Sequence, residues 1–149
     1  MSVAVQQAPF DLAAEVAALT QGQPEIGAVV TFTGRVRADE GHVASITLEH
    51  YAGMTEAELK RIEAEAHARW PLLATRIIHR VGELAAGEDI VLVITASAHR
   101  QAAFDAAGFL MDYLKTRAPF WKKETAPSGE TKWVEMREAD AAAARRWRS

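Results

Sequence analysis

The chain has 149 residues, of which 49% are apolar and 25% are charged, and its net charge is −3. This length suits one well-cored domain, so a single domain over residues 1–149 is predicted. The absence of cysteine excludes disulfides, thiolate nucleophiles and Cys-ligated metals, and the negative charge argues against a general polyanion binder.

The first predicted element lies in the N-terminal segment. This segment lacks the basic start and apolar core of a signal peptide, and no apolar run in the chain is long enough to span a membrane. A cytoplasmic protein without membrane contact is therefore expected. Asp11 precedes a run of helix-forming residues, which predicts an N-cap followed by a helix over residues 12–20.

Two strands are predicted next, over residues 26–37 and 42–51, because both segments are rich in β-branched residues or alternate between apolar and polar. Gly34 marks a bulge or a close approach within the first strand. Alternation puts Arg35 and Arg37 on one face. Because only a short turn separates the two segments, we expect them to pair as a β-ribbon.

The middle of the chain predicts a helix and two further strands. Thr55 and Glu58 have the spacing of a capping box, and Pro71 closes the helix by residue 70. The strands cover residues 75–82 and 88–98 and are joined by a turn at 85–87. The second is apolar on both faces, which indicates a central position in its sheet.

The last third of the chain predicts a long helix and a hairpin. Ser97 is expected to cap a helix over residues 98–117, which Pro119 ends. Strands over 119–126 and 131–136 flank a Pro- and Gly-containing loop, as a short hairpin requires. The predicted fold is α+β, with helices packed on mostly antiparallel sheet.

The long helix carries a lysine at the border of its apolar face. The core stripe is formed by Ala103, Ala107, Leu110 and Leu114, and Lys115 lies at its edge with Met111. A lysine there is as easily a snorkelling surface residue as a functional one. Gly108 costs about 1 kcal/mol relative to alanine in a helix, so it favours a bound tail or ligand close to the helix.

The first turn of the same helix contains His99 and Arg100. Cations oppose the helix dipole at this end, yet the free N–H groups there favour anions. Two interpretations stay open, a phosphate or carboxylate site and a solvated first turn.

Strand alternation after Pro119 puts Phe120, Lys122 and Glu124 on one face, with Trp121 and Lys123 on the other. The rigid proline turn can hold Lys115 and Lys122 on two sides of one pocket. Two alternatives remain: a basic edge strand that resists aggregation, or aromatic and basic residues that bind single-stranded nucleic acid.

Familiar motifs of other chemistries are absent from the sequence. It contains no dinucleotide-binding glycine fingerprint, no P-loop, no serine-hydrolase elbow and no zinc-protease motif. The five histidines are scattered singly, and His79, inside a predicted strand, is interpreted as structural. No metal site and no cofactor are predicted.

Several long strings of the sequence resemble one known family. "GAVVTFTGRVR", "LEHYAGMTE", "ITASAHR", "FLMDYLKTRAPFWKKE" and "KWVEMREAD" occur in the order found in the large, catalytic subunit of molybdopterin synthase. The match runs from about residue 10 to residue 147. The resemblance implies an α/β-hammerhead core with an additional antiparallel β subdomain, and a homodimer of this chain within a heterotetramer.

The resemblance also implies a reaction, in which cyclic pyranopterin monophosphate receives two sulfurs and becomes the dithiolene of molybdopterin. The sulfur arrives as the C-terminal Gly-Gly thiocarboxylate of a small ubiquitin-like partner subunit, in agreement with a chain that lacks cysteine. The family's essential lysines match Lys115 and Lys122. The positions that line the substrate and tail pocket, some of them from the opposite protomer, match Phe32, Arg37, His99, Arg100, Met111 and Arg137.

Two other classes remain open from the residues themselves. A partner-binding scaffold without chemistry would make both lysines replaceable, whereas a nucleic-acid-binding module would use the Lys, Trp and Phe run. The resemblance implies neither nucleic acid nor membrane as a partner.

Overall fold

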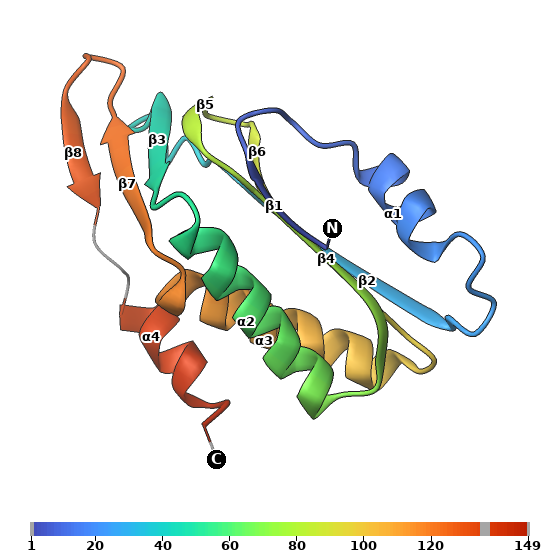
Figure 1. Cartoon of the computed structure of the whole chain (residues 1–149). Helices are drawn as coiled ribbons and strands as arrows, with labels where there is room; N and C mark the ends of the chain where they lie inside the picture. Colours follow the sequence, from blue (N-terminus) through green and yellow to red (C-terminus); the bar gives the residue numbers. More distant parts are fainter. Residues whose placement is uncertain (1, 135–137, 149) are drawn as a thin grey trace.

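The structure, a computed structural model, describes residues 2–134 and 138–148 (Figure 1). Its elements are β1 (Val3–Gln6), α1 (Leu12–Thr20), β2 (Ala28–Arg35), β3 (Ser45–His50), α2 (Met54–Arg69), β4 (Leu72–Arg80), β5 (Gly82–Ala85), β6 (Asp89–Ser97), α3 (Arg100–Arg117), β7 (Phe120–Thr125), β8 (Thr131–Val134) and α4 (Glu138–Arg145).

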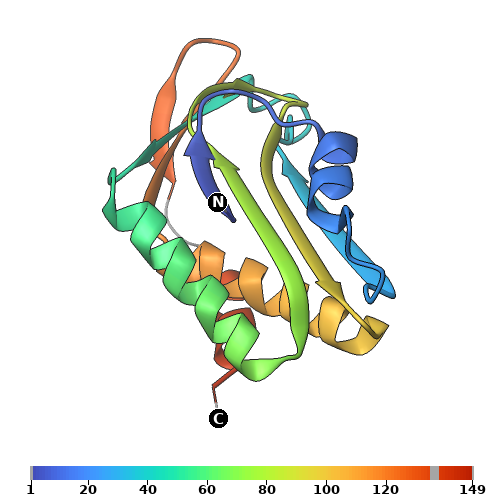
Figure 2. The same cartoon turned by 45° about the vertical axis from the view of Figure 1, so that its right-hand side comes forward.

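The first sheet has the strand order β1-β4-β6-β2, with helices on both faces (Figures 1 and 2). Successive residues of a strand point to opposite faces. Ile77 of β4 accordingly packs in the core beneath α2 and α3, whereas Ile78 packs against α1. The central position predicted for the apolar strand β6 is confirmed, because β6 lies between β4 and β2.

The second sheet has the order β5-β3-β7-β8 and all its pairs are antiparallel. It stands at one end of the first sheet, and the predicted hairpin forms its edge as β7 and β8 (Figure 1). An α+β fold, an α/β-hammerhead core and an additional antiparallel β subdomain are thus confirmed.

The predicted β-ribbon is wrong, because β2 pairs with β6 and β3 pairs with β5 and β7. The connection after β2 buries Val36 and Val43 in the small core of the second sheet. Asp39 and Glu40 within it have positive φ angles of 51° and 55°. This connection therefore turns the chain away from β2 and delivers β3 to the other sheet. The irregularity predicted at Gly34 is confirmed, since the register of β2 shifts between Gly34 and Arg35.

Two helix starts differ from the prediction. The N-cap of α2 is Gly53, whose N–H donates to Glu56 Oε1 at 2.9 Å, so the expected cap residue Thr55 lies inside the helix. The buried Thr55 hydroxyl instead donates to the Pro119 carbonyl at 3.2 Å. Ser97 ends β6, and the N-cap of α3 is His99. The Thr55 hydroxyl is thus used in a tertiary contact that sequence spacing does not contain, whereas the Ser97 hydroxyl donates locally to the His99 carbonyl. The Asp11 cap of α1 is confirmed, with Asp11 Oδ1 accepting from Ala14 N at 3.1 Å.

The C-terminal segment packs back onto α3. Trp147 Nε1 donates to Asp112 Oδ2 at 2.7 Å, and Arg146 forms an ion pair with the same oxygen at 3.0 Å. A Cβ atom added to Gly108 would lie 3.4 Å from Arg146 and 3.6 Å from Trp147. The chain's own C-terminal segment therefore makes the close approach predicted at Gly108. Among the described residues, no helix is long and apolar enough to cross a membrane.

Candidate functional site

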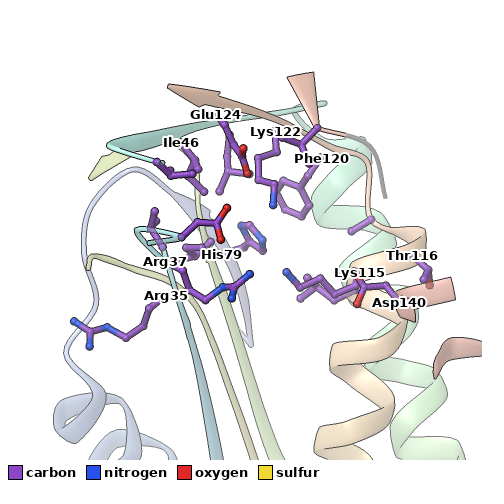
Figure 3. A pocket seen from close by; sticks show the side chains of 18 residues that line it. Arg35, Arg37, Ile46, His79, Lys115, Thr116, Phe120, Lys122, Glu124 and Asp140 are labelled. Atoms are coloured by element: carbon purple, nitrogen blue, oxygen red, sulfur yellow. The ribbon is translucent and has the colours of Figure 1, made fainter. Parts of the chain in front are cut away.

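A cavity of about 410 Å³ opens where the end of the first sheet, the C-terminal end of α3 and the second sheet meet (Figure 3). Its apolar walls come mainly from the connection after β2, from β3 and from the last turn of α3. Its ionisable lining residues are Arg35, Arg37, Asp39, His79, Lys115, Lys122, Glu124 and Asp140. The segments are far apart in sequence, so the cavity exists only in the folded chain.

Lys115 lies in the last turn of α3, and its ammonium group points into this cavity (Figure 3). A cation at a helix C-terminus is favoured by the dipole, which would account for a purely structural lysine. Arg117, two residues later, illustrates the structural use: it pairs with Glu58 at 2.7 Å and with Glu65 at 2.8 Å. Lys115 has no such partner among the described residues, so its charge is available to a ligand.

Lys122 reaches the same cavity from the opposite wall, on β7. The predicted alternation is confirmed, because Phe120, Lys122 and Glu124 all line the cavity. Lys123 lies on the outer face, where its ammonium is 5.8 Å from the Trp133 ring centroid. The basic and aromatic run is thereby divided between two faces of the sheet, and does not form one continuous stacking surface for nucleic acid.

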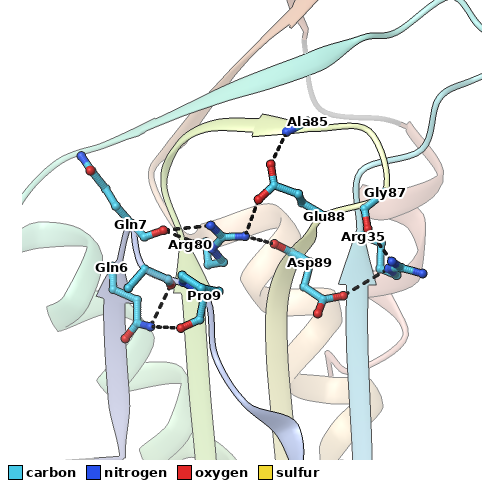
Figure 4. A network of polar contacts seen from close by, with 10 residues as sticks. Gln6, Gln7, Pro9, Arg35, Arg80, Ala85, Gly87, Glu88 and Asp89 are labelled. Atoms are coloured by element: carbon cyan, nitrogen blue, oxygen red, sulfur yellow. Dashed lines mark hydrogen bonds and ion pairs between the residues drawn. The ribbon is translucent and has the colours of Figure 1, made fainter.

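Arg37 follows β2, and Figure 3 shows its guanidinium group directed into the cavity toward Lys115. No hydrogen bond or ion pair holds it to the described residues. Arg35 is different, because it points away, pairs with Asp89 at 3.2 Å and donates to the Gly87 carbonyl (Figure 4). The two arginines thus have separate roles, although alternation predicts a common face.

A network of polar contacts centred on the buried Arg80 holds Asp89 and the neighbouring turn in place beside the cavity (Figure 4). Arg80 donates to the Gln7 carbonyl at 3.0 Å, to the Asp89 carbonyl at 2.9 Å and to Glu88 at 3.3 Å. A hydrogen bond from the Ala85 N–H lowers the pKa of Glu88, which keeps this carboxylate charged beside Arg80. The network therefore ties β1 to β4 and β6 next to the cavity.

His79, which the sequence places among structural residues, also lines the cavity. It is only 6% exposed and its ring stacks on Phe120, with centroids 3.8 Å apart and planes at 19°. Burial lowers the pKa of His79 from 6.5 to about 4. The hydrogen bond to the Arg80 carbonyl opposes this shift, and the charges of Lys115 and His50 add to it. The ring is therefore uncharged at neutral pH. The sequence shows only a histidine inside an apolar strand, and this pattern is the same for a structural histidine and for one that lines a site.

The other predicted site residues lie elsewhere in the chain's own fold. His99 and Arg100 are exposed beside Gly27 at the N-terminal end of α3, and Arg100 is about 22 Å from Lys115 along the helix at 1.5 Å per residue. Phe32 is 42% exposed on the edge strand β2. Met111 is half-buried against the main core. Arg137 lies outside the described residues.

No group of three or more histidine, aspartate or glutamate side chains in residues 2–134 and 138–148 is arranged to hold a metal ion. The ionisable groups of the cavity are its cations, its carboxylates and one neutral imidazole. An anionic ligand is the best match, since Arg37 and Lys115 are without a protein counter-ion among those residues.

Comparison with known proteins identifies the family. The sequence model of the MoaE protein family matches residues 5–117, well over half of the chain. The chain belongs to this family. The resemblance inferred from the sequence motifs is thereby confirmed.

Individual MoaE relatives are similar to this chain in sequence and structure along nearly its whole length. A molybdopterin synthase catalytic subunit of Mesorhizobium japonicum is 58% identical over 149 residues, which cover 99% of this chain and 94% of that protein. The molybdopterin biosynthesis MoaE protein of Burkholderia ambifaria is 50% identical with a TM-score of 0.83, over 99% of this chain and 98% of that one. These relatives confirm the prediction of an enzyme of molybdenum cofactor biosynthesis.

A more distant solved structure shares the fold. It is a protein–protein complex of subunits 1 and 2 of molybdopterin-converting factor from Helicobacter pylori, with 17% identity and a TM-score of 0.76. The match covers 92% of this chain and 92% of that one.

Proposed function

We propose that the cavity binds cyclic pyranopterin monophosphate and is the place where two sulfurs are transferred to it. Both sulfurs come from the C-terminal Gly-Gly thiocarboxylate of a small ubiquitin-like partner subunit, and the product is the dithiolene of molybdopterin. The observation that carries the proposal is a pair of cations, Arg37 and Lys115, that face one cavity and form no ion pair with the described residues. Both proposed ligands are anions.

The two lysines have different positions and therefore different proposed roles. Lys115, at the end of α3, is the partner of the thiocarboxylate: its charge offsets that of the tail, and its amine transfers a proton or acts as the nucleophile during sulfur transfer. Lys122, on β7 across the cavity, faces the pterin. Arg37 binds the phosphate, because a guanidinium group can donate two parallel hydrogen bonds to phosphate oxygens.

The source of the sulfur follows from composition. A chain without cysteine has no thiol on which to carry sulfur, so a carrier must bring it. The two-subunit complex of the Helicobacter pylori protein supports a small-subunit partner of this kind. In each transfer a carbon–sulfur bond replaces a carbon–oxygen bond on the pterin. The acyl carbon–sulfur bond of the carrier is hydrolysed, so water supplies the oxygen with which the carrier leaves as an ordinary carboxylate.

A second copy of the chain completes the proposed site. His99 and Arg100 are exposed on α3 and too far from Lys115 to act on the same bound molecule within one protomer. We propose that they serve the cavity of the partner protomer in a homodimer, within a heterotetramer that includes two small subunits. Phe32, Met111 and Arg137 are proposed as further lining residues of the assembled pocket.

We expect Arg37→Ala to weaken binding of the pterin precursor by about 1–3 kcal/mol, the range for a charge-assisted hydrogen bond. Titration calorimetry of the purified chain with the precursor measures this. Arg35→Ala is the matched control, because Arg35 lies two residues earlier but is paired with Asp89 and directed away. Equal losses in both variants would argue against a phosphate contact at Arg37.

A further inference from the structure

The side chain of His79 is buried, but one of its ring nitrogens, Nε2, reaches the cavity and has no hydrogen-bond partner among the described residues. The Nδ1 atom of His79 is 2.8 Å from the Arg80 carbonyl oxygen, which can only accept, so Nδ1 carries the proton. The Nε2 atom then bears a lone pair and is an acceptor. In the described part of the chain every buried side-chain nitrogen or oxygen is hydrogen-bonded. Because Nε2 has no such bond there, it must be accessible from the cavity that His79 lines.

The ring cannot turn away from this position easily. It is held by stacking on Phe120, with centroids 3.8 Å apart, and by the hydrogen bond to Arg80. The side chain is only 6% exposed. Its surroundings are fixed by β4, β7 and α3, so Nε2 is a pre-oriented acceptor.

The charges that face the ring explain why a neutral acceptor is useful there. Lysine and arginine side chains only donate hydrogen bonds, so the cations of the cavity bind anionic groups, and the N–H groups of a ligand need an acceptor, either a carboxylate of the lining or the Nε2 atom of His79. A cationic histidine would add one more donor and repel these charges. Low pKa, caused mainly by burial, keeps His79 neutral across the physiological range. The charged and titratable groups around it are Arg35 at the end of β2, Arg37 and Asp39 after β2, His50 on β3, Arg80 on β4, Lys115 on α3, Lys122 and Glu124 on β7, and Asp140 on α4.

We infer that His79 is a substrate-binding residue, whose Nε2 accepts a hydrogen bond from an N–H group of the bound pterin. This rests on the proposed function, because it requires that a pterin occupies the cavity. The pterin ring carries amino and ring N–H groups, so it offers the donors that Nε2 lacks in the free protein. Stacking on Phe120 is then part of the binding site, since it orients the imidazole.

Two substitutions of His79 distinguish the contribution of the Nε2 acceptor to binding from that of the stacked ring. His79→Asn keeps an N–H group near the position of Nδ1 but places nothing at Nε2, whereas His79→Gln can place an amide oxygen at about the distance of Nε2. Both lose the stacked ring equally. We expect His79→Asn to weaken precursor binding on the order of tenfold, the effect of one lost hydrogen bond, and His79→Gln to bind within about threefold of the unchanged chain. Binding of the small subunit should be unaffected in both.

A measurement on the unsubstituted chain tests the same inference if the variants fold poorly. Nitrogen-15 NMR of the histidine rings should show the Nε2 signal of His79 moving toward its hydrogen-bonded position when the precursor is added, with Nδ1 still protonated. An unmoved Nε2 signal at saturating precursor, or equal binding by the Asn and Gln variants, would overturn the inference and leave the proposed function standing. An unchanged chain that does not bind the precursor at all would overturn both.

Discussion

Replacing Lys115 by alanine or by arginine is expected to lower sulfur transfer on the order of 100-fold or more, the range for loss of a positioned proton-transfer group. Arginine keeps the charge that the helix C-terminus favours, but it does not readily lose a proton or act as an amine nucleophile. Because Lys115 is exposed and has no ion pair among the described residues, both variants should fold and bind the small subunit. Single-turnover formation of the dithiolene measures the effect.

Neighbouring lysines of β7 supply the control. Lys122→Ala should also impair transfer, since this side chain lines the cavity, whereas Lys123→Ala should leave it nearly unchanged, since Lys123 lies over Trp133 on the outer face. Near-normal transfer by Lys115→Arg would mean that positive charge suffices at this position. Near-normal transfer by the alanine variants of both Lys115 and Lys122 would leave only a scaffold role.

The second large effect concerns stability and is expected at Phe109, at the centre of the main core. Phe109 is fully buried, and its ring contacts Tyr113, Trp70 and Trp147 at centroid distances of 4.5, 5.3 and 5.7 Å. Phe109→Ala should lower the free energy of unfolding by about 3–5 kcal/mol, because the transfer free energy is lost and a cavity remains. Chemical denaturation measures this quantity.

The same helix contains the control for this change. Phe104 is 60% exposed, so Phe104→Ala should change the free energy of unfolding by less than about 0.5 kcal/mol. A loss of under about 1 kcal/mol in the Phe109 variant would mean that the C-terminal segment and α2 do not pack on α3 as described.

Local periodicity predicted the parts of the fold that depend on one segment at a time. The four residues of the α3 core stripe are all buried, and the alternation along β7 places Lys122 in the cavity. Both results follow from the geometry of a single helix or strand. The sequence could also predict that Lys115 and Lys122 face each other across one cavity, because only Pro119 and a short turn separate the helix from the strand.

Local periodicity could not predict which strands from distant segments pair. The partners of β2 and β3 depend on burial of Val36 and Val43, which local alternation does not report. Gly108 suggested a close approach correctly, but its neighbour Trp147 comes from the far end of the chain. His79 was missed because its environment is made by β7 and α3, and burial alone looks the same in a structural and a binding histidine.

Sulfur transfer reconstituted from purified components tests directly whether this chain makes the dithiolene from the thiocarboxylate of a carrier. The chain is mixed with the pterin precursor and with the small subunit, once as the thiocarboxylate and once as the ordinary carboxylate. We expect dithiolene formation with two thiocarboxylates consumed per precursor, no product with the carboxylate, and no product from the chain and precursor without a carrier. Dithiolene formed at the same rate when the chain is omitted, or a stable complex of chain and thiocarboxylate that never yields product, would contradict this expectation.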